Sequence, residues 1–452
     1  MHVFGHIFLL APHFLVGFPL FVLNMYVMEV MLLKKDNQLS FVTYEASLKL
    51  SSSDPVKLIF DAIDWSFIYP LVEDKYSNTG RAGFDPVSMF KAQLLIYLGE
   101  VKSDRSLASS LSFNARHCLL CGFNNFLDTP THGAFSQFRK RLGEETFYKI
   151  LRKIIAQAIV LNVIGGESAA VDSTHISAYS NSSGKRTCNC RGKCEHKRVY
   201  SDPDARTGAK SENHYFFGYK VHMVVDRKSG LPIDVIVTSG EVGDSPYLKP
   251  LIERAKENHP DLEIKNISAD AAYDSYENYH FLIKDSKMTP FIALNPRGSD
   301  KSFPLGELSL TSDGKYLCIA GHQLVSRGRD RSMSNRLKLR CPAAMGRVNC
   351  LFRDVCSSSS YGKIFYVYPD KELRLIGPVP RGTNEWKLNY NNRTAAERAN
   401  SELKGEHKLD NLRVRGLKNV TIHACLSIVA QVLKRTARVS KERVPLECAA
   451  AA

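Results

Sequence analysis

Residues 390–404 read YNNRTAAERANSELK, from Tyr390 to Lys404. Ala, Glu, Arg, Leu and Lys dominate this stretch, and these residues favour an α-helix. On a helix with about 100° per residue, Tyr390, Arg393, Glu397 and Lys404 fall within one stripe roughly 60° wide. An acid beside two bases and a phenol suits a site where a metal-bound carboxylate meets a phosphate backbone. The same stripe would also suit an ordinary solvated helix face.

The spacing Y-x2-R-x3-E-x6-K resembles the signature of a large branch of insertion-sequence transposases of the DDE class, found in bacteria and archaea. The resemblance implies that Glu397 is the third acid of a metal-binding triad. It also implies that two aspartates lie upstream, each on a β-strand.

Two upstream acids stand in stretches that are typical of strands. Residues 168–178 (SAAVDSTHISA) are small, apolar or β-branched, and predict a buried strand that carries Asp172. Residues 264–274 (IKNISADAAYD) predict another strand, which ends at Asp270. A buried carboxylate is costly unless it is paired or binds a metal. Asp172 is therefore either a metal ligand or an acid that caps neighbouring backbone amides.

The elements around these acids predict an α/β fold with a mixed sheet flanked by helices. Besides the two strands, we expect strands over 215–226, 231–238 and 289–294, and helices over 250–255 and 275–284. This order is the one that a ribonuclease-H-like core requires, and acids far apart in sequence converge there. We expect this catalytic core to span residues 165–295 and 382–440. Further blocks that resemble the same transposases are 171–174 (VDST), 218–222 (GYKVH), 269–274 (ADAAYD) and 413–416 (RVRG).

The region before the core, residues 49–160, has helical patterns. Asp85, Ser103 and Thr131 are expected to begin three of its helices. In the third helix the expected apolar stripe consists of Phe135, Phe138 and Leu142, and the bases that crowd its end are Arg139, Lys140 and Arg141. Short helices with a basic final member fit an all-helical DNA-binding domain of the helix-turn-helix kind. A plain helical bundle with a solvated basic edge fits the same pattern.

The composition is globular, and 61 lysines and arginines against 46 acids give a net charge of +15. This balance favours a polyanionic partner, although it does so weakly. At the N-terminus, residues 7–28 contain no formally charged side chain, and we expect residues 1–48 to be a hydrophobic leader outside the folded domains. We interpret it as an over-extended start, since Met25, Met28 or Met31 could begin the protein. A membrane anchor is the alternative, and Pro12 and Pro19 argue against it.

The 11 cysteines are an odd number and indicate a reducing compartment. Cys188, Cys190, Cys194 and His196 lie in a loop rich in Gly, Arg and Lys. They could hold zinc, but the first pair is separated by only one residue, so we favour a basic DNA-facing loop with incidental thiols.

A segment over residues 296–381 is expected to interrupt the core as a small insertion subdomain. It is rich in Gly, Ser and Arg, and its apolar content is low for a core of its own. Such a small module often needs a metal. Its four cysteines, which could hold a structural Zn²⁺ ion, are Cys318, Cys341, Cys350 and Cys356.

The resemblance implies a Mg²⁺-dependent (or Mn²⁺-dependent) DNA transposase, in which Asp172, Asp270 and Glu397 hold the ions. Such an enzyme binds the terminal inverted repeats of its element, cuts the DNA ends and joins them to target DNA. The expected DNA contacts of the core are Tyr390, Arg393, Lys404, Lys220 and Trp386. The resemblance also implies a homodimer on double-stranded DNA. It implies a location at the nucleoid of a prokaryotic cytoplasm, with no membrane partner. A nuclease of the same fold and an inactive DNA-binding relic that acts as a repressor are the alternatives.

Overall fold

A computed structural model of the chain describes residues 39–450, apart from residues 78, 80, 81, 186, 192–194, 197, 212, 296–301, 332, 334 and 335. Only the backbone is described for residues 210, 211, 302 and 443–450. The hydrophobic run over residues 7–28 and its alternative starts lie outside the described residues. Among the described residues, no helix is long and apolar enough to cross a membrane.

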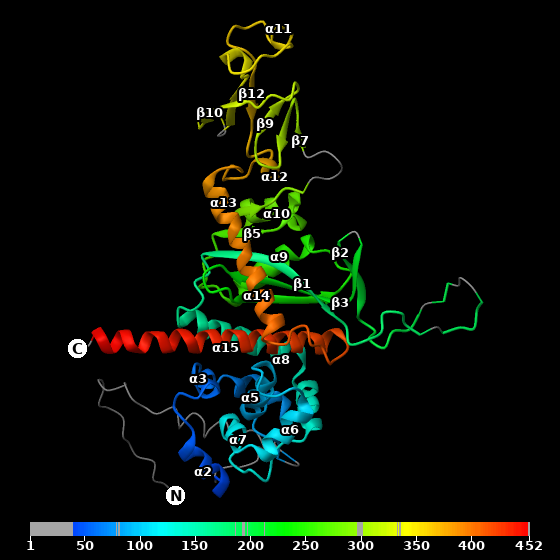
Figure 1. Cartoon of the computed structure of the whole chain (residues 1–452), viewed down its shortest axis with the longest axis vertical. Helices are drawn as coiled ribbons and strands as arrows, with labels where there is room; N and C mark the ends of the chain where they lie inside the picture. Colours follow the sequence, from blue (N-terminus) through cyan, green and yellow to red (C-terminus); the bar gives the residue numbers. More distant parts are fainter. Residues whose placement is uncertain are drawn as a thin grey trace, which may run out of the picture.

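The first third of the described chain is helical (Figure 1). Its helices are α2 (Phe41–Lys49), α3 (Pro55–Asp61), α4 (Ile68–Val72), the 3-10 turn η1 (Glu73–Lys75), α5 (Pro86–Tyr97), α6 (Asp104–Phe113), α7 (Ala115–Cys121) and α8 (His132–Val160). Helix α2 packs against α7, and Ser40 caps it by accepting a hydrogen bond from the Thr43 amide. The helical region thus begins at residue 41, inside the stretch that we expected to belong to the leader.

The three expected helix starts are confirmed, and at two of them a short polar side chain caps the first turn. Asp85 accepts a hydrogen bond from the amide of Ser88, and Ser103 forms a capping box with Ser106. Thr131 is the residue before α8, but its side chain makes no capping hydrogen bond.

Helix α8 is longer than the predicted third helix, which was expected to end near residue 142. It runs to Val160 across a kink at Gly143, whose φ of +72° suits glycine. The apolar stripe is buried as predicted at residues 135, 138 and 142, and it resumes with Phe147, Ile150 and Ile154 after the kink. The resumed stripe explains why the chain returns to a helix.

A mixed sheet follows the helical region. Its strands are β1 (Ser168–Ser177), β2 (Arg206–Ser211), β3 (His214–Asp226), β4 (Pro232–Ser239), β5 (Asn266–Ala269) and β6 (Thr289–Ile292). Strand β3 pairs antiparallel with β1, β2 and β4, whereas β1–β5 and β5–β6 are parallel. The sheet order is β2-β3-β1-β5-β6, with β4 also on β3. The expected mixed α/β architecture is therefore confirmed.

Short helices connect these strands and the last helices return to the sheet. They are η2 (Ser245–Tyr247), α9 (Leu248–Asn258), η3 (Ala271–Tyr273), α10 (Tyr276–His280), the π-helical turn η4 (Phe281–Asp285), α13 (Asn384–Tyr390), η6 (Asn391–Arg393), α14 (Thr394–Gly405) and α15 (Leu417–Ala450). The expected single helix over residues 390–404 is wrong in one respect, because a 3-10 turn separates α13 from α14. That turn displaces Tyr390 from the regular spacing of the stripe.

Helix α15 lies between the helical region and the sheet (Figure 1) and contacts α3, α5, α8 and β4. Every residue from 420 to 433 is buried. A helix that is buried on all sides is a core element. This helix joins the two parts of the molecule.

The segment between β6 and α13 forms the tip farthest from the helical region (Figure 1). It contains two three-stranded sheets, formed by β7 (Ser302–Leu305), β8 (Leu308–Thr311) and β9 (Tyr316–Cys318), and by β10 (Val325–Asp330), β11 (Arg336–Arg340) and β12 (Ile364–Val367). The short elements η5 (Ala343–Met345), α11 (Arg353–Cys356) and α12 (Leu373–Ile376) complete it. The expectation that this segment has too little apolar content for a core is wrong. Alternating strand residues such as Phe303, Leu310 and Leu339 point inward and form a second, small apolar cluster.

Candidate active site

The two predicted aspartates lie side by side because β1 and β5 are parallel neighbours. The register pairs Val171 with Ala269, so that Asp172 and Asp270 occupy the next position on each chain. Asp172 lies within β1, and Asp270 follows the end of β5 and caps η3 by accepting a hydrogen bond from the Ala272 amide at 2.8 Å. Both side chains are half-buried.

Glu397 approaches the same place from α14, which packs on β1 and β3. Burial raises the pKa of Asp172 to about 6, and the negative charges of Asp270 and Glu397 contribute. Burial also raises the pKa of Asp270, with a contribution from Asp244. The three predicted acids therefore interact electrostatically, although among the described residues their oxygens do not form a group within 4.8 Å of one another.

Positive and aromatic side chains lie beside this acid cluster. Arg393 donates a hydrogen bond to Glu397 at 2.5 Å, and its guanidinium lies 5.7 Å from the centre of the Tyr390 ring. The Tyr390 ring is stacked on Trp386, with 4.8 Å between the ring centres. Trp386, Tyr390 and Arg393 thus form one continuous stack that ends at the Glu397 carboxylate.

Lys404, the last residue of the predicted stripe, reaches β1. Its ammonium donates to the carbonyl oxygen of His175 at 2.7 Å and lies 3.3 Å from an oxygen of Asp410. On α14, Lys404 lies about two turns after Glu397.

Two residues at the site were missed by sequence reasoning. Asn400 donates a hydrogen bond to Asp172 at 3.0 Å, and its position one turn after Glu397 on the same helix could have indicated this. Asp244 adds a fourth acid near Asp270, and it accepts from Lys220 at 2.9 Å. It lies in the loop after β4, and we find no sequence signal for it. Lys220, which we predicted to contact DNA, therefore forms an ion pair with Asp244 in this structure.

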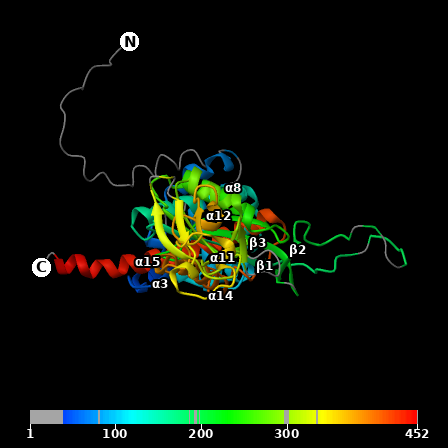
Figure 2. The same cartoon turned by 90° about the horizontal axis from the view of Figure 1, so that it is seen from above.

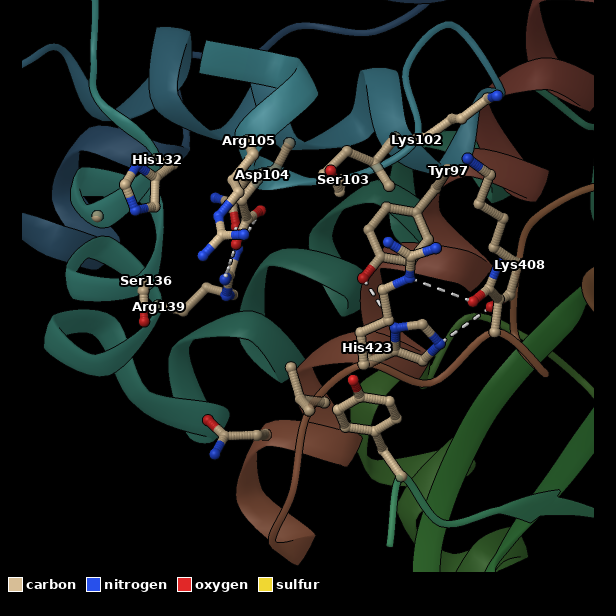
Figure 3. Close-up of a pocket in the computed structure, with 18 residues that line it drawn as sticks. Tyr97, Lys102, Ser103, Asp104, Arg105, His132, Ser136, Arg139, Lys408 and His423 are labelled. Carbon is tan, nitrogen blue, oxygen red and sulfur yellow. Dashed lines mark hydrogen bonds and ion pairs between the residues drawn. The ribbon is translucent and has the colours of Figure 1, made fainter. Parts of the chain in front are cut away.

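A separate cleft of about 720 Å³ lies between the helical region and the segment that follows α14 (Figure 3). Lys102, Arg105, Lys408 and Arg413 line it, and among the described residues none of them forms an ion pair with an acid. Burial, together with the nearby charges of Arg413 and Lys102, lowers the pKa of Lys408. The cleft is thus electropositive, and it holds uncompensated cations close together.

The three bases predicted on α8 have different surroundings. Arg139 lines the same cleft, but its guanidinium is bound by Asp104 and Gln93 (Figure 3). Arg141 stacks on the ring of Tyr76, and Lys140 is exposed. Only Lys140 and Arg141 therefore present charge to solvent.

The four cysteines of the 296–381 segment line one small cavity of about 110 Å³, together with His322. They are the last residue of β9, the residue after β11, a residue shortly before α11 and the last residue of α11. Their sulfur atoms do not form a group within 4.8 Å of one another among the described residues. The tertiary structure thus gathers residues that are widely spaced in sequence.

Comparison with known proteins assigns the class. Residues 165–433, more than half of the chain, match the family described as "Transposase DDE domain", and residues 44–141 match "Transposase domain (DUF772)". The protein is a transposase. More closely, it belongs to the DDE-domain family, whose members cleave DNA and transfer its strands.

No curated protein matches the chain. One similar solved structure is the cryo-EM structure of the piggyBac transposase synaptic complex with hairpin DNA. It is 12% identical over 92% of this chain and 76% of that chain, with a TM-score of 0.33. A TM-score of this size does not establish a shared fold.

The raised pKa of Asp172 predicts a pH-dependent cost of folding in the presence of EDTA. An unfolded aspartate ionises near pH 4, whereas Asp172 ionises at about pH 6. The free-energy penalty that the ionised Asp172 imposes on the folded state is therefore absent below pH 4. It grows as the pH rises and reaches its full value above pH 6. Asp172→Asn should raise the free energy of unfolding by about 1–3 kcal/mol at pH 8 and by roughly half as much at pH 5. Denaturant unfolding would measure this, with Glu263→Gln, an exposed acid, as the control. An equal effect at both pH values would contradict the assignment.

Proposed function

We propose that the protein binds the terminal inverted repeats of its insertion sequence, cuts the DNA ends and joins them to target DNA. The observation that carries this proposal is the convergence of Asp172, Asp270 and Glu397 from β1, β5 and α14. The strand arrangement supports a ribonuclease-H-like core, because an antiparallel β1–β3–β4 set continues into parallel β5 and β6. We assign this core to residues 165–295 and 382–440, with the DNA-binding helical domain before it and the insertion over 296–381.

The acid cluster fits divalent cations. Asp172 and Asp270 are half-buried, and the charges of Asp270 and Glu397 raise the pKa of Asp172, so this cluster needs a positive partner. Mg²⁺ and Mn²⁺ favour oxygen ligands. Asp172, Asp270 and Glu397 would hold the ions, with Asn400 fixing one oxygen of Asp172. When bound, two such ions supply nucleophile activation and stabilisation of the leaving oxygen.

The remaining residues position the DNA. Arg393 neutralises Glu397 and is partly exposed, so it can also bind a phosphate oxygen beside the scissile bond. The stack of Trp386 on Tyr390 offers an aromatic surface for an unpaired base. Water would serve as the nucleophile that cuts the element end, and the released DNA 3′-hydroxyl would attack the target phosphate, with the cut strand leaving through its own 3′-oxygen.

The basic cleft provides a second contact for the same DNA. Lys408 and Arg413 follow α14 in sequence, and Lys102 and Arg105 face them from the helical domain. Uncompensated cations on two domains match a phosphate backbone that crosses from one domain to the other. In a homodimer, each subunit would place one DNA end in this way.

We also infer a structural zinc ion within the insertion, held by the four cysteines that line its small cavity. Thiolates favour Zn²⁺, and the shared cavity places all four thiols around one space. The apolar cluster of this segment is small, so a metal would add stability to it.

Cys341→Ser should release one zinc ion per chain, because serine is a poor zinc ligand. Metal analysis of the purified full chain measures this directly. Retention of all bound zinc in this variant would contradict the inference.

Glu397→Gln should abolish cleavage and joining while leaving DNA binding unchanged, because the substitution removes one charge and almost no volume. We expect a loss of roughly 10³-fold or more in rate, since several kcal/mol of transition-state stabilisation depend on metal-bound carboxylates. The assay uses DNA with the flanking terminal repeats and Mg²⁺, and it scores cut and joined products separately. Cutting without joining in the wild type would identify a nuclease, and binding without either would identify a relic.

Glu253→Gln is the matched control for this change. Glu253 is also on a helix, pairs with a base four residues earlier and has a side chain 47% exposed, against 49% for Glu397. Equal activity of the wild type and Glu397→Gln would show that Glu397 is only a surface acid.

Lys102→Gln combined with Arg413→Gln should weaken binding of the terminal-repeat DNA roughly tenfold or more. The slope of log K against log salt should decrease in magnitude by about 0.9 for each lost phosphate contact. A salt titration of DNA affinity measures both quantities. Lys249→Gln with Lys265→Gln is the control, because these exposed lysines do not line the cleft. An unchanged slope in the cleft variant would place the DNA elsewhere.

A further inference from the structure

A long segment between β1 and β2 projects from the body of the molecule in both views (Figures 1 and 2). We call residues 178–205 the arm. Loops longer than about 12–15 residues without regular structure are uncommon and are usually functional. In the described part of the arm, paired hydrogen bonds between Lys185 and Val199 form an isolated bridge. The arm is therefore a hairpin-like extension with little apolar material to hold it.

Beyond this bridge, three side chains converge. The sulfurs of Cys188 and Cys190 and a ring nitrogen of His196 all lie within 4.8 Å of one another. The Cys190 sulfur is 3.8 Å from Nδ1 of His196. In tetrahedral zinc sites, the usual bond lengths place a sulfur and a nitrogen ligand about 3.6 Å apart. The spacing in the arm is thus close to that of a zinc site.

The ligand atoms of these three side chains indicate which metal ion they would bind. Two thiols and an imidazole are the ligands of structural zinc, whereas Mg²⁺ and Ca²⁺ require oxygen donors. The short interval between Cys188 and Cys190 argued against zinc in the sequence, but the folded arm brings both sulfurs to the same side as His196. Cys194 lies outside the described residues.

We propose that the arm carries a zinc-binding site formed by Cys188, Cys190 and His196. The ion would cross-link the distal part of the arm, beyond the Lys185–Val199 bridge and the hydrogen bond that Arg198 donates to the carbonyl oxygen of Ser183. A metal cross-link of this kind limits the conformational freedom of a loop that has no hydrophobic core of its own.

The base of the arm is fixed to the segment that precedes α15. Arg415 donates to the carbonyl oxygen of Tyr179 at 2.8 Å, and the amide of Leu417 donates to Asp204 at 2.8 Å. Tyr179 also lines the basic cleft. With both ends of the arm fixed beside that cleft, zinc at the distal end would hold the basic residues of the arm in a set orientation toward DNA. This consequence for DNA rests on the proposed function, whereas zinc binding itself does not.

The test is the zinc content of the full chain, purified under reducing conditions and measured by elemental analysis. Cys190→Ser and His196→Asn should each lose one zinc ion per chain relative to the wild type. Replacement of zinc by Co²⁺ should give thiolate charge-transfer absorption, which decreases by the contribution of one site in both variants. Both ligands are exposed, so neither substitution should unfold the protein.

Lys185→Gln and Arg191→Gln change the charge of the same arm without removing a ligand, and they should keep the full zinc content. Cys341→Ser affects only the insertion, and its combination with Cys190→Ser should show additive loss. Zinc content that is the same in the wild type, Cys190→Ser and His196→Asn would overturn the proposal, and so would a wild-type protein whose arm cysteines all react freely with a thiol reagent. A loss of zinc with normal DNA cleavage would still support the metal site, so failure of the proposed function is distinguishable.

Discussion

The parallel pairing of β1 with β5 is the constraint on which the site depends. It places Asp172 and Asp270 side by side although 97 residues of chain separate them. Two half-buried carboxylates in this arrangement oppose folding, because burial and like charge both disfavour ionisation. The surrounding groups offset part of this cost. Asn400 donates to Asp172, and Arg393 neutralises the third acid, Glu397. The remaining negative charge is what a divalent cation would balance.

The sequence predicted the order of strands and helices in the core because strand alternation, helix caps and turn residues are local signals. The starts of α5 and α6 at Asp85 and Ser103 are examples, since a side chain caps an amide two or three residues away. The assignment of individual bases to DNA was less secure, because it depends on tertiary partners. Lys220 and Arg139 both have basic side chains in suitable stretches, yet Asp244 and Asp104 occupy them. Neither pairing has a local signature, and the break between α13 and α14 has none either.

Helix α15 connects the helical region with the sheet that carries Asp172. It is buried on all sides over residues 420–433 and contacts both the helical region and β4 of the sheet. The basic cleft lies next to its start, and His423 of this helix bonds Tyr97 of α5 within the cleft (Figure 3). The cations that line this cleft therefore come from two regions that one buried helix joins.

The arm and the insertion show how this chain extends beyond a compact core. Each projects from the body of the molecule (Figure 1), and each contains cysteines. The insertion has two small sheets and an apolar cluster, so a metal there would reinforce an existing structure. The described arm has only one backbone bridge. A metal would therefore matter more for the conformation of the arm than for that of the insertion, because the arm has no apolar cluster and depends on a few hydrogen bonds, such as Ser180–Ser201 and Arg198–Ser183, against the chain entropy of so long a loop.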